Sequence, residues 1–110
     1  MKKAIIIAAL FWSLPAFAGS FENVRDKAMH GDYQAQRNLA YGYSSHPYAG
    51  QEKSPLLACA WRKLILRSGS EKVDQTDTNN FQVYCGQLTE DQQRIAEAQA
   101  QRLFAEIYKR

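Results

Sequence analysis

The stretch GDYQAQRNLAYGY, residues 31–43, places a turn directly before a helical pattern. Gly31 interrupts any preceding helix, and Asp32 is a residue type that favours the N-cap of the next one. The apolar residues that follow recur every three or four positions, at Ala35, Leu39, Ala40 and Tyr43. This spacing predicts a helix from Tyr33 to about Ser44. Its small residues indicate a helix that fits closely against a neighbour.

A helix upstream and a loop downstream are predicted on the same grounds. Residues 21–29 form a short apolar face with helical spacing, made of Phe21, Val24, Ala28 and Met29. Residues 45–53 contain Pro47 and Gly50, which interrupt regular structure and predict a loop.

The next helix is predicted to run from Pro55 to about Arg67. Ser54 suits the N-cap, proline suits the first turn, and Gly69 suits a left-handed cap after the helix. Its apolar stripe holds Leu57, Ala60, Trp61, Leu64 and Ile65. Its wetter side holds Arg62, Lys63 and Arg67, which is typical of a solvated helix face, with a role in partner binding as the alternative.

Two more helices complete the chain. The first is predicted from about Asp77 to Leu88, with an apolar face of Phe81, Tyr84, Cys85 and Leu88. Thr89 and Gln92 form a capping box for the last helix, which runs to about Tyr108. Its apolar side holds Ala96, Ala100, Leu103, Phe104 and Ile107. No useful stretch alternates with a period of two, so the predicted fold is all-α, with about four to five helices.

The N-terminus has the three parts of a secretory signal peptide. A basic start precedes a short apolar run, which Pro15 ends before the small residues Ala16 and Ala18. We therefore expect cleavage after Ala18, a single domain over residues 19–110, and a location in the periplasm of a Gram-negative bacterium. An uncleaved membrane anchor is the alternative, although the apolar run is too short to span a bilayer comfortably.

Charge gives no reason to expect nucleic acid as a partner. Loss of Lys2 and Lys3 with the signal peptide lowers the formal net charge from +3 to +1. Charges of both signs are interspersed along the remaining chain, so no basic patch is indicated.

Cys59 and Cys85 are the two cysteines. An even count in an oxidising compartment predicts a disulfide, and two cysteines allow one intramolecular pairing. Two buried free thiols are the alternative. No histidine lies near enough in sequence to suggest a zinc site, and we expect no metal and no cofactor.

Several fixed spacings resemble a Sel1-like repeat, which belongs to the tetratricopeptide-like solenoids. Its first helix, A-Q-x-x-L-G-x-x-Y, is similar to the positions Ala35, Gln36, Leu39, Ala40 and Tyr43. Its second helix, A-x-x-W followed by glycine, is similar to the positions Ala58, Trp61 and Gly69. Residues 88–103 resemble the terminal capping helix of such proteins. The resemblance covers about residues 28–108 and implies helix-turn-helix pairs stacked side by side.

The chain departs from the Sel1-like pattern at three points. Ala40 replaces a glycine, residues 44–50 replace a Gly-x-Gly loop, and Ile65-Leu66 replaces a pair of alanines. The second repeat is degenerate. The pattern therefore indicates one good repeat flanked by capping helices.

Few residues suggest catalysis. His46 lies beside Ser44 and Ser45, but adjacent residues in a loop rarely reach the geometry of a catalytic triad. We expect His30 to be a turn residue. The sequence therefore predicts no catalytic residue and no enzyme.

Tyrosines are the stronger candidates for a binding surface. Tyr33 and Tyr41 are eight residues apart, on roughly the same side of their helix, and Tyr48 lies in the following loop. They could form an exposed aromatic patch, which suits protein interfaces. Ordinary packing within the solenoid is the alternative. With Arg62, these three tyrosines are the candidate partner-binding residues.

The Sel1-like resemblance implies a protein–protein interaction module. Within that class we expect an adaptor or regulator of an envelope protein, or an immunity protein that neutralises a toxin delivered to the periplasm. Two different classes stay open beside it: a hydrolase of envelope material, and a structural or stress-related protein with no fixed partner.

Overall fold

The computed structural model describes the backbone of residues 13–109 and the side chains of residues 20–109. Within this range the protein is all-α, as predicted, with five helices and no strand. The helices are α2 (Ser13–Met29), α3 (Tyr33–Ser44), α4 (Pro55–Arg67), α5 (Gln75–Gly86) and α6 (Glu90–Tyr108). The expected signal peptide, residues 1–18, lies mostly outside the described residues. Among the described helices, none combines the length and the apolar character that a membrane crossing requires.

Three helices begin where their caps predict. Asp32 and Ser54 each accept a hydrogen bond from the backbone N–H three residues further on. Thr89 and Gln92 form the predicted capping box at the start of α6. Gly69 has a φ of 80°, which confirms it as the left-handed residue that follows α4.

The first helix is longer than predicted. It begins at Ser13 instead of Phe21, so it continues through the expected cleavage site. Pro15 is compatible with this start, because the N–H groups of the first turn have no partner within a helix.

The start of α5 also differs from the prediction. The helix begins at Gln75, two residues before the expected position. Asp74 is its N-cap and Asp77 completes a capping box, so each aspartate accepts a hydrogen bond from the backbone N–H of the other. This pair was hidden in a polar stretch, because the usual capping box has serine or threonine followed by glutamate or glutamine.

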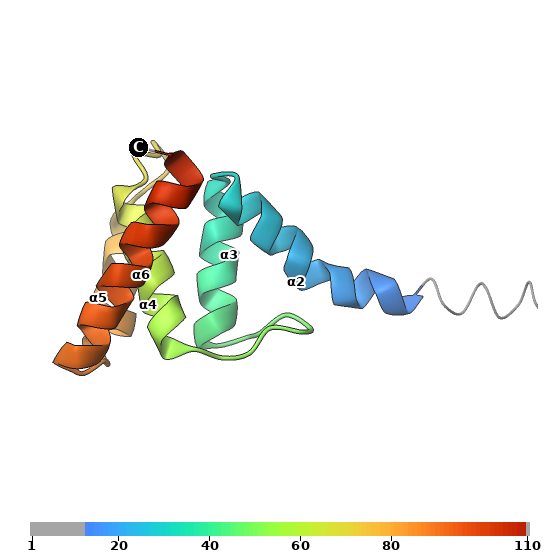
Figure 1. Ribbon diagram of the computed structural model, residues 1–110, viewed down its shortest axis with the longest axis horizontal. Coiled ribbons are helices and arrows are strands. Elements are labelled where there is room, and N and C mark those ends of the chain that lie inside the picture. The colour runs from blue at the N-terminus through green and yellow to red at the C-terminus, as the bar shows by residue number, and fades with distance from the viewer. Residues whose placement is uncertain (1–12, 110) are drawn as a thin grey trace, which may run out of the picture.

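The chain reverses direction at each connection between α3 and α6 (Figure 1). Helix α4 is central and packs against α3, α5 and α6, while α2 packs against α3. In Figure 1, α6 lies in front of α4, and α2 extends to one side. The faces of α4 are therefore divided among three neighbours.

Two apolar clusters hold the helices together. The first joins α2, α3 and α4 through the buried residues Ala28, Ala35, Leu39, Ala40, Trp61 and Leu64. The C-terminal part of α6 also packs against this cluster. The second joins α4, α5 and α6 through Cys59, Ala60, Cys85, Ala96 and Ala100. Alanines make up half of the first cluster, and the second consists of alanine and cysteine alone, which permits close approach of the helices.

A buried glutamine fastens the loop between α3 and α4. Gln51 is 6% exposed, and its amide donates a hydrogen bond to the Leu39 carbonyl at 3.1 Å. Its Oε1 accepts a hydrogen bond from the Tyr48 N–H at 3.0 Å. Gly42 makes room for this side chain, since a Cβ there would lie 2.1 Å from Gln51 Oε1.

We therefore expect Gly42→Ala to lower the free energy of unfolding by about 1–2 kcal/mol, because it displaces a buried side chain that makes two hydrogen bonds. Urea unfolding followed by circular dichroism measures this change. Gly86→Ala is the matched control, because a Cβ at Gly86 meets nothing within 4 Å. Equal effects of the two substitutions would contradict the role assigned to Gln51.

Candidate functional site: a polar groove between α3, α4 and α5

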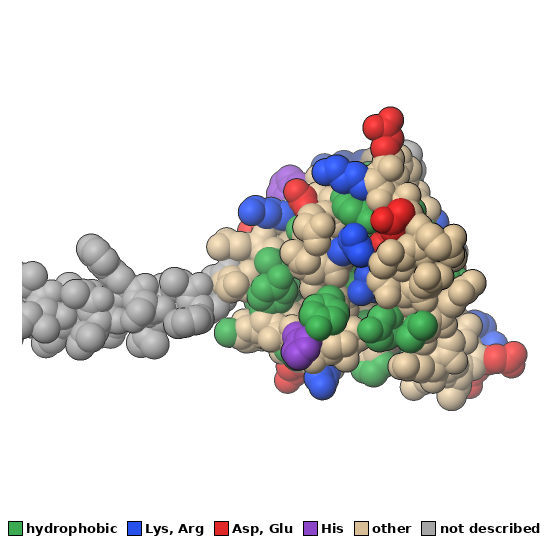
Figure 2. Space-filling view, turned by 180° about the vertical axis from the view of Figure 1, so that it is seen from behind, with side chains coloured by type: hydrophobic (Ala, Val, Ile, Leu, Met, Phe, Trp, Pro, Cys, Tyr) green, Lys and Arg blue, Asp and Glu red, His purple; other side chains and the backbone are tan. Residues whose placement is uncertain are grey.

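A polar pocket of about 360 Å³ lies between α3 and α5, with α4 at its base. Its lining comes from three helices: Gln34, Arg37, Asn38, Tyr41, Arg62, Asn80 and Tyr84. We call this pocket the α3–α5 groove. Figure 2 shows the molecule from behind, where basic and acidic side chains gather beside hydrophobic ones. The α6 helix lies on the opposite, front side of α4 (Figure 1).

Arg62 lies at the base of the α3–α5 groove and is buried. Only 4% of its surface is exposed, so the expectation of a solvated face is wrong for this residue. Arg62 is two residues after Ala60, about 200° further around the helix, and so faces away from α6. The walls formed by α3 and α5 cover it. This burial was hidden in the sequence because it depends on helices distant along the chain.

The guanidinium of Arg62 is poorly compensated. Its Nε and Nη1 atoms are buried and have no hydrogen-bond partner within the described protein. Its carbon atom lies over the ring of Tyr84, 5.6 Å from the ring centroid. Burial lowers the pKa of Arg62 from its usual value, because a charged group loses hydration there.

Asp77 supplies the negative charge beside the α3–α5 groove. It is 1% exposed, although its position in a polar stretch gave no sign of burial. The Tyr33 hydroxyl donates a hydrogen bond to Asp77 Oδ2 at 2.6 Å, and Arg37 Nε lies 3.3 Å from Asp77 Oδ1. The second contact is an ion pair without the alignment of a hydrogen bond. These contacts tie the N-terminal part of α5 to α3.

Tyr33 has a structural position in this network. Burial, followed by its hydrogen bond to Asp77, raises the pKa of Tyr33 to about 12. The Arg37 guanidinium lies over its ring, 5.5 Å from the centroid. Tyr33 therefore remains protonated and donates to Asp77 throughout the neutral pH range.

The α3–α5 groove has a surplus of positive charge. Two guanidinium groups, of Arg37 and Arg62, line it, and one carboxylate, of Asp77, lies beside it. The Tyr33 hydroxyl donates to one oxygen of that carboxylate, and Arg37 forms an ion pair with the other, which accepts no hydrogen bond within the described residues. The surplus therefore lies on Arg62, at the bottom of the pocket.

The structure brings some of the candidate partner-binding residues together. Tyr41 and Arg62 line the same pocket, and Tyr33 lies beside it through Arg37. Tyr41 is 46% exposed and packs against the His46 ring, with centroids 5.1 Å apart. Tyr48 lies in the 45–54 loop, where its N–H is bonded to a side chain of the same loop. Sequence reasoning missed the role of Asp77.

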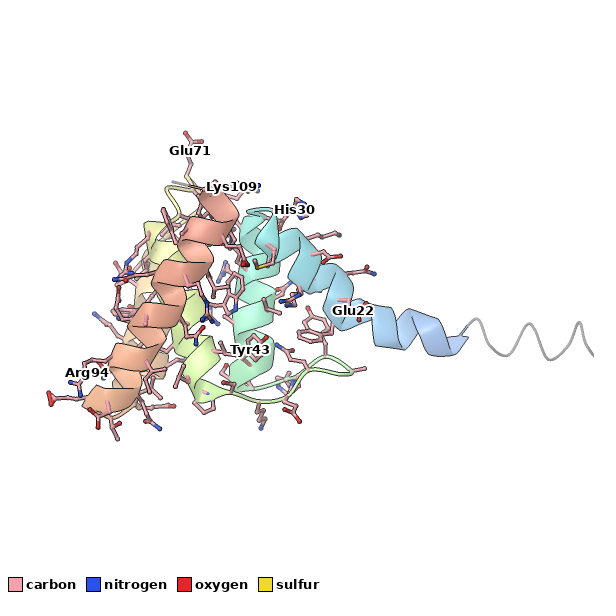
Figure 3. The ribbon with its side chains drawn as sticks, in the orientation of Figure 1. Glu22, His30, Tyr43, Glu71, Arg94 and Lys109 are labelled. Carbon is pink, nitrogen blue, oxygen red and sulfur yellow. A yellow bond between two sulfur atoms is a disulfide. The ribbon has the colours of Figure 1, made fainter. Side chains whose placement is uncertain are left out.

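The serines near His46 make other contacts. Ser44 Oγ donates a hydrogen bond to the Tyr41 carbonyl at 3.2 Å, and lies 3.1 Å from Ser45 Oγ. The ring of His46 rests on Tyr41. His30 follows α2, and its Nδ1 lies 2.7 Å from the Asp26 carbonyl, at the turn that Figure 3 labels.

The residues that resemble a Sel1-like repeat lie where α3 and α4 meet. Six of them are buried, namely Ala35, Gln36, Leu39, Ala40, Ala58 and Trp61. Tyr43 is half-buried, at the end of α3 that meets the loop (Figure 3), and its ring meets Phe21 edge-on at 6.4 Å. These residues pack one helical hairpin, and none of them lines the α3–α5 groove.

The predicted disulfide is present. Cys59 on α4 and Cys85 on α5 are joined, with Cα atoms 4.8 Å apart. The bond fixes the C-terminal part of α5 to α4. A disulfide is typical of oxidising environments outside the cytoplasm.

On the opposite side of α4, Glu97 pairs with two basic residues. Arg67 donates two hydrogen bonds to its carboxylate at 2.7 Å, and Lys63 donates one at 3.0 Å. The Arg67 contact, above all, holds the pKa of Glu97 at about 2. Because this pKa is depressed, the stabilisation is present above the ordinary glutamate pKa and is lost as the pH falls towards 2.

We expect Glu97→Gln to lower the free energy of unfolding by about 1 kcal/mol near pH 7, since the pairs lie at the surface. The difference from the unsubstituted protein should shrink below about pH 4 and disappear near pH 2. Urea unfolding across this pH range measures it. Glu22→Gln, an exposed position on α2 labelled in Figure 3, is the control and should show no such pH dependence.

Comparison of this chain with models of known protein families, with curated proteins and with solved structures finds no match.

Proposed function

We propose that this chain is a periplasmic protein–protein interaction module of the Sel1-like repeat type, acting as an adaptor or regulator of an envelope protein. The α3–α5 groove is the observation that carries this proposal. Three helices line it, its lining is polar and aromatic, and it holds a buried cation, Arg62, two of whose nitrogen atoms lack a hydrogen-bond partner among residues 20–109. Such a surface suits recognition of a specific partner.

Two further features support this reading. The motif residues on α3 and α4 are buried between the two helices, as a helix-turn-helix unit of a tetratricopeptide-like array requires. The Cys59–Cys85 disulfide agrees with export to an oxidising compartment. Cleavage after Ala18 would then release the domain from its leader.

Affinity capture from a periplasmic extract, followed by mass spectrometry, tests the proposal. Tyr41→Ala removes an exposed aromatic side chain at the edge of the groove, whereas Tyr33 is unsuitable because it holds Asp77. Ile95→Ala on α6 is the matched control, because Ile95 is similarly exposed, at 50%, on a helix that does not line the groove.

The proposal predicts one dominant partner, retained by Ile95→Ala and lost with Tyr41→Ala. Recovery of no specific partner, or equal recovery with both variants, would contradict a partner surface at the groove.

A further inference from the structure

The α3–α5 groove combines a buried, uncompensated guanidinium with amides on both walls. Arg62 is 4% exposed and has two nitrogen atoms without a hydrogen-bond partner within the described protein. Buried donors of this kind are costly unless a partner satisfies them, and a charged donor is more costly than a neutral one. Arg62 is also one of the residues that line the pocket, so its side chain borders the space that a ligand would fill.

The nearby carboxylate of Asp77 contacts other groups, which leaves the Arg62 guanidinium available for a carboxylate from a ligand. Asp77 is engaged by Tyr33 at 2.6 Å, by Arg37 at 3.3 Å and by the N–H of Asp74 at 3.1 Å. The Arg62 guanidinium carbon lies over the ring of Tyr84, 5.6 Å from its centroid, a contact that uses none of the N–H donors. A carboxylate matches a guanidinium, because it can accept two parallel hydrogen bonds from it.

The size and lining of the pocket favour a piece of polypeptide. At about 360 Å³ it lies at the small end of ligand pockets, so it suits a side chain or a chain end better than a large cofactor. Asn38 and Asn80 line its two walls, and their amides can both donate to and accept from a peptide backbone.

We infer that the α3–α5 groove binds a carboxylate group of the protein partner, supplied by an acidic side chain or by the chain's C-terminus, through the Arg62 guanidinium. The inference rests on the proposed function and adds the chemistry by which the partner is recognised. The bound carboxylate replaces the missing partner of Arg62 and balances the surplus positive charge of the groove.

Nuclear magnetic resonance titration of the whole chain tests this inference. The signal of the Arg62 Nε–Hε group reports directly on its hydrogen bonding. The probes are acetyl-glutamic acid N-methylamide, which has a side-chain carboxylate, and acetyl-alanine, which has only a terminal one. Acetyl-glutamine N-methylamide is the neutral counterpart of the first probe.

A saturable shift of the Arg62 signal is expected with at least one carboxylate probe, and the tighter of the two identifies the source of the carboxylate. The neutral probe should bind at least about tenfold more weakly, since it lacks a charge-assisted hydrogen bond. No shift with either carboxylate, an equal shift with the neutral probe, or tighter binding of inorganic phosphate would overturn the inference.

Variants extend the test to the partner itself. Arg62→Gln should lose about tenfold or more in affinity for the carboxylate probe and for the captured partner. Arg94→Gln removes the same charge from an exposed position near the start of α6, far from His30 and α2 in Figure 3, and should leave both unchanged. A partner that binds wild type and Arg62→Gln equally overturns this inference while the proposed function stands. If Arg62→Gln fails to fold, the comparison of the probes on the wild-type chain decides.

Discussion

Replacement of both cysteines, as Cys59→Ala/Cys85→Ala, is expected to lower the free energy of unfolding by about 3.5 kcal/mol. The disulfide joins positions 26 residues apart, and closing a loop of that length in the unfolded chain gives this magnitude on the chain-entropy model. A domain of this size has a total stability of about 5–10 kcal/mol, so the loss is a large share of it.

Helix α5 makes the disulfide especially important. Its buried residues are Asp77 and Cys85, and Phe81 adds only a partly buried apolar contact, so apolar burial contributes little to its attachment. Urea unfolding of the wild-type and double-variant chains, each with and without dithiothreitol, measures the effect. The reductant should destabilise the wild type and leave the variant unchanged. A loss below about 1 kcal/mol would contradict the role assigned to the bond.

Asp77→Ala is expected to lower the free energy of unfolding by about 3 kcal/mol, the second-largest effect. The substitution removes a buried carboxylate that Tyr33 and Arg37 contact, and it breaks the capping box of α5. Loss of one member of a buried ion pair is costly because the remaining charge has no partner. Asp77→Asn should cost about half as much, since the amide oxygen still accepts hydrogen bonds.

The matched control for this prediction is Asp91→Ala. Asp91 also pairs with an arginine, Arg94, but both side chains are exposed at the start of α6. Surface pairs of this kind contribute about 1 kcal/mol or less. Urea unfolding of the three variants side by side measures the difference. If Asp77→Ala cost no more than Asp91→Ala, the buried network would have no special importance.

The helices were predictable wherever local chemistry marks them. Asp32, Ser54 and Thr89 each cap a helix by accepting a hydrogen bond from the backbone N–H three residues further on. Because both partners are close in sequence, such caps can be predicted from a short stretch of residues. The start of α5 was missed because Asp74 and Asp77 cap each other in an unusual combination. The expected disulfide followed from cysteine count and compartment, independently of the fold.

The α3–α5 groove could be predicted only in part. Tyr41 and Arg62 were named from the sequence, but as members of two separate surfaces. Their meeting depends on the way α3 and α5 flank α4, which no short spacing encodes. The burial of Asp77 depends on Tyr33, 44 residues away, and sequence periodicity carries no signal over that distance.

The two attachments of α5 act on one helix at two points. Asp77 binds α3, and Cys85 is bonded to α4, eight residues or about 12 Å further along. Each attachment keeps the other at high effective concentration, as in a bidentate chelate. Loss of either weakens the one that remains, so the two losses together should cost less than the sum of their separate costs. The position of α5, which forms one wall of the groove, therefore depends on both attachments acting together. The geometry of the groove thus depends on the redox state of a disulfide that lies outside it.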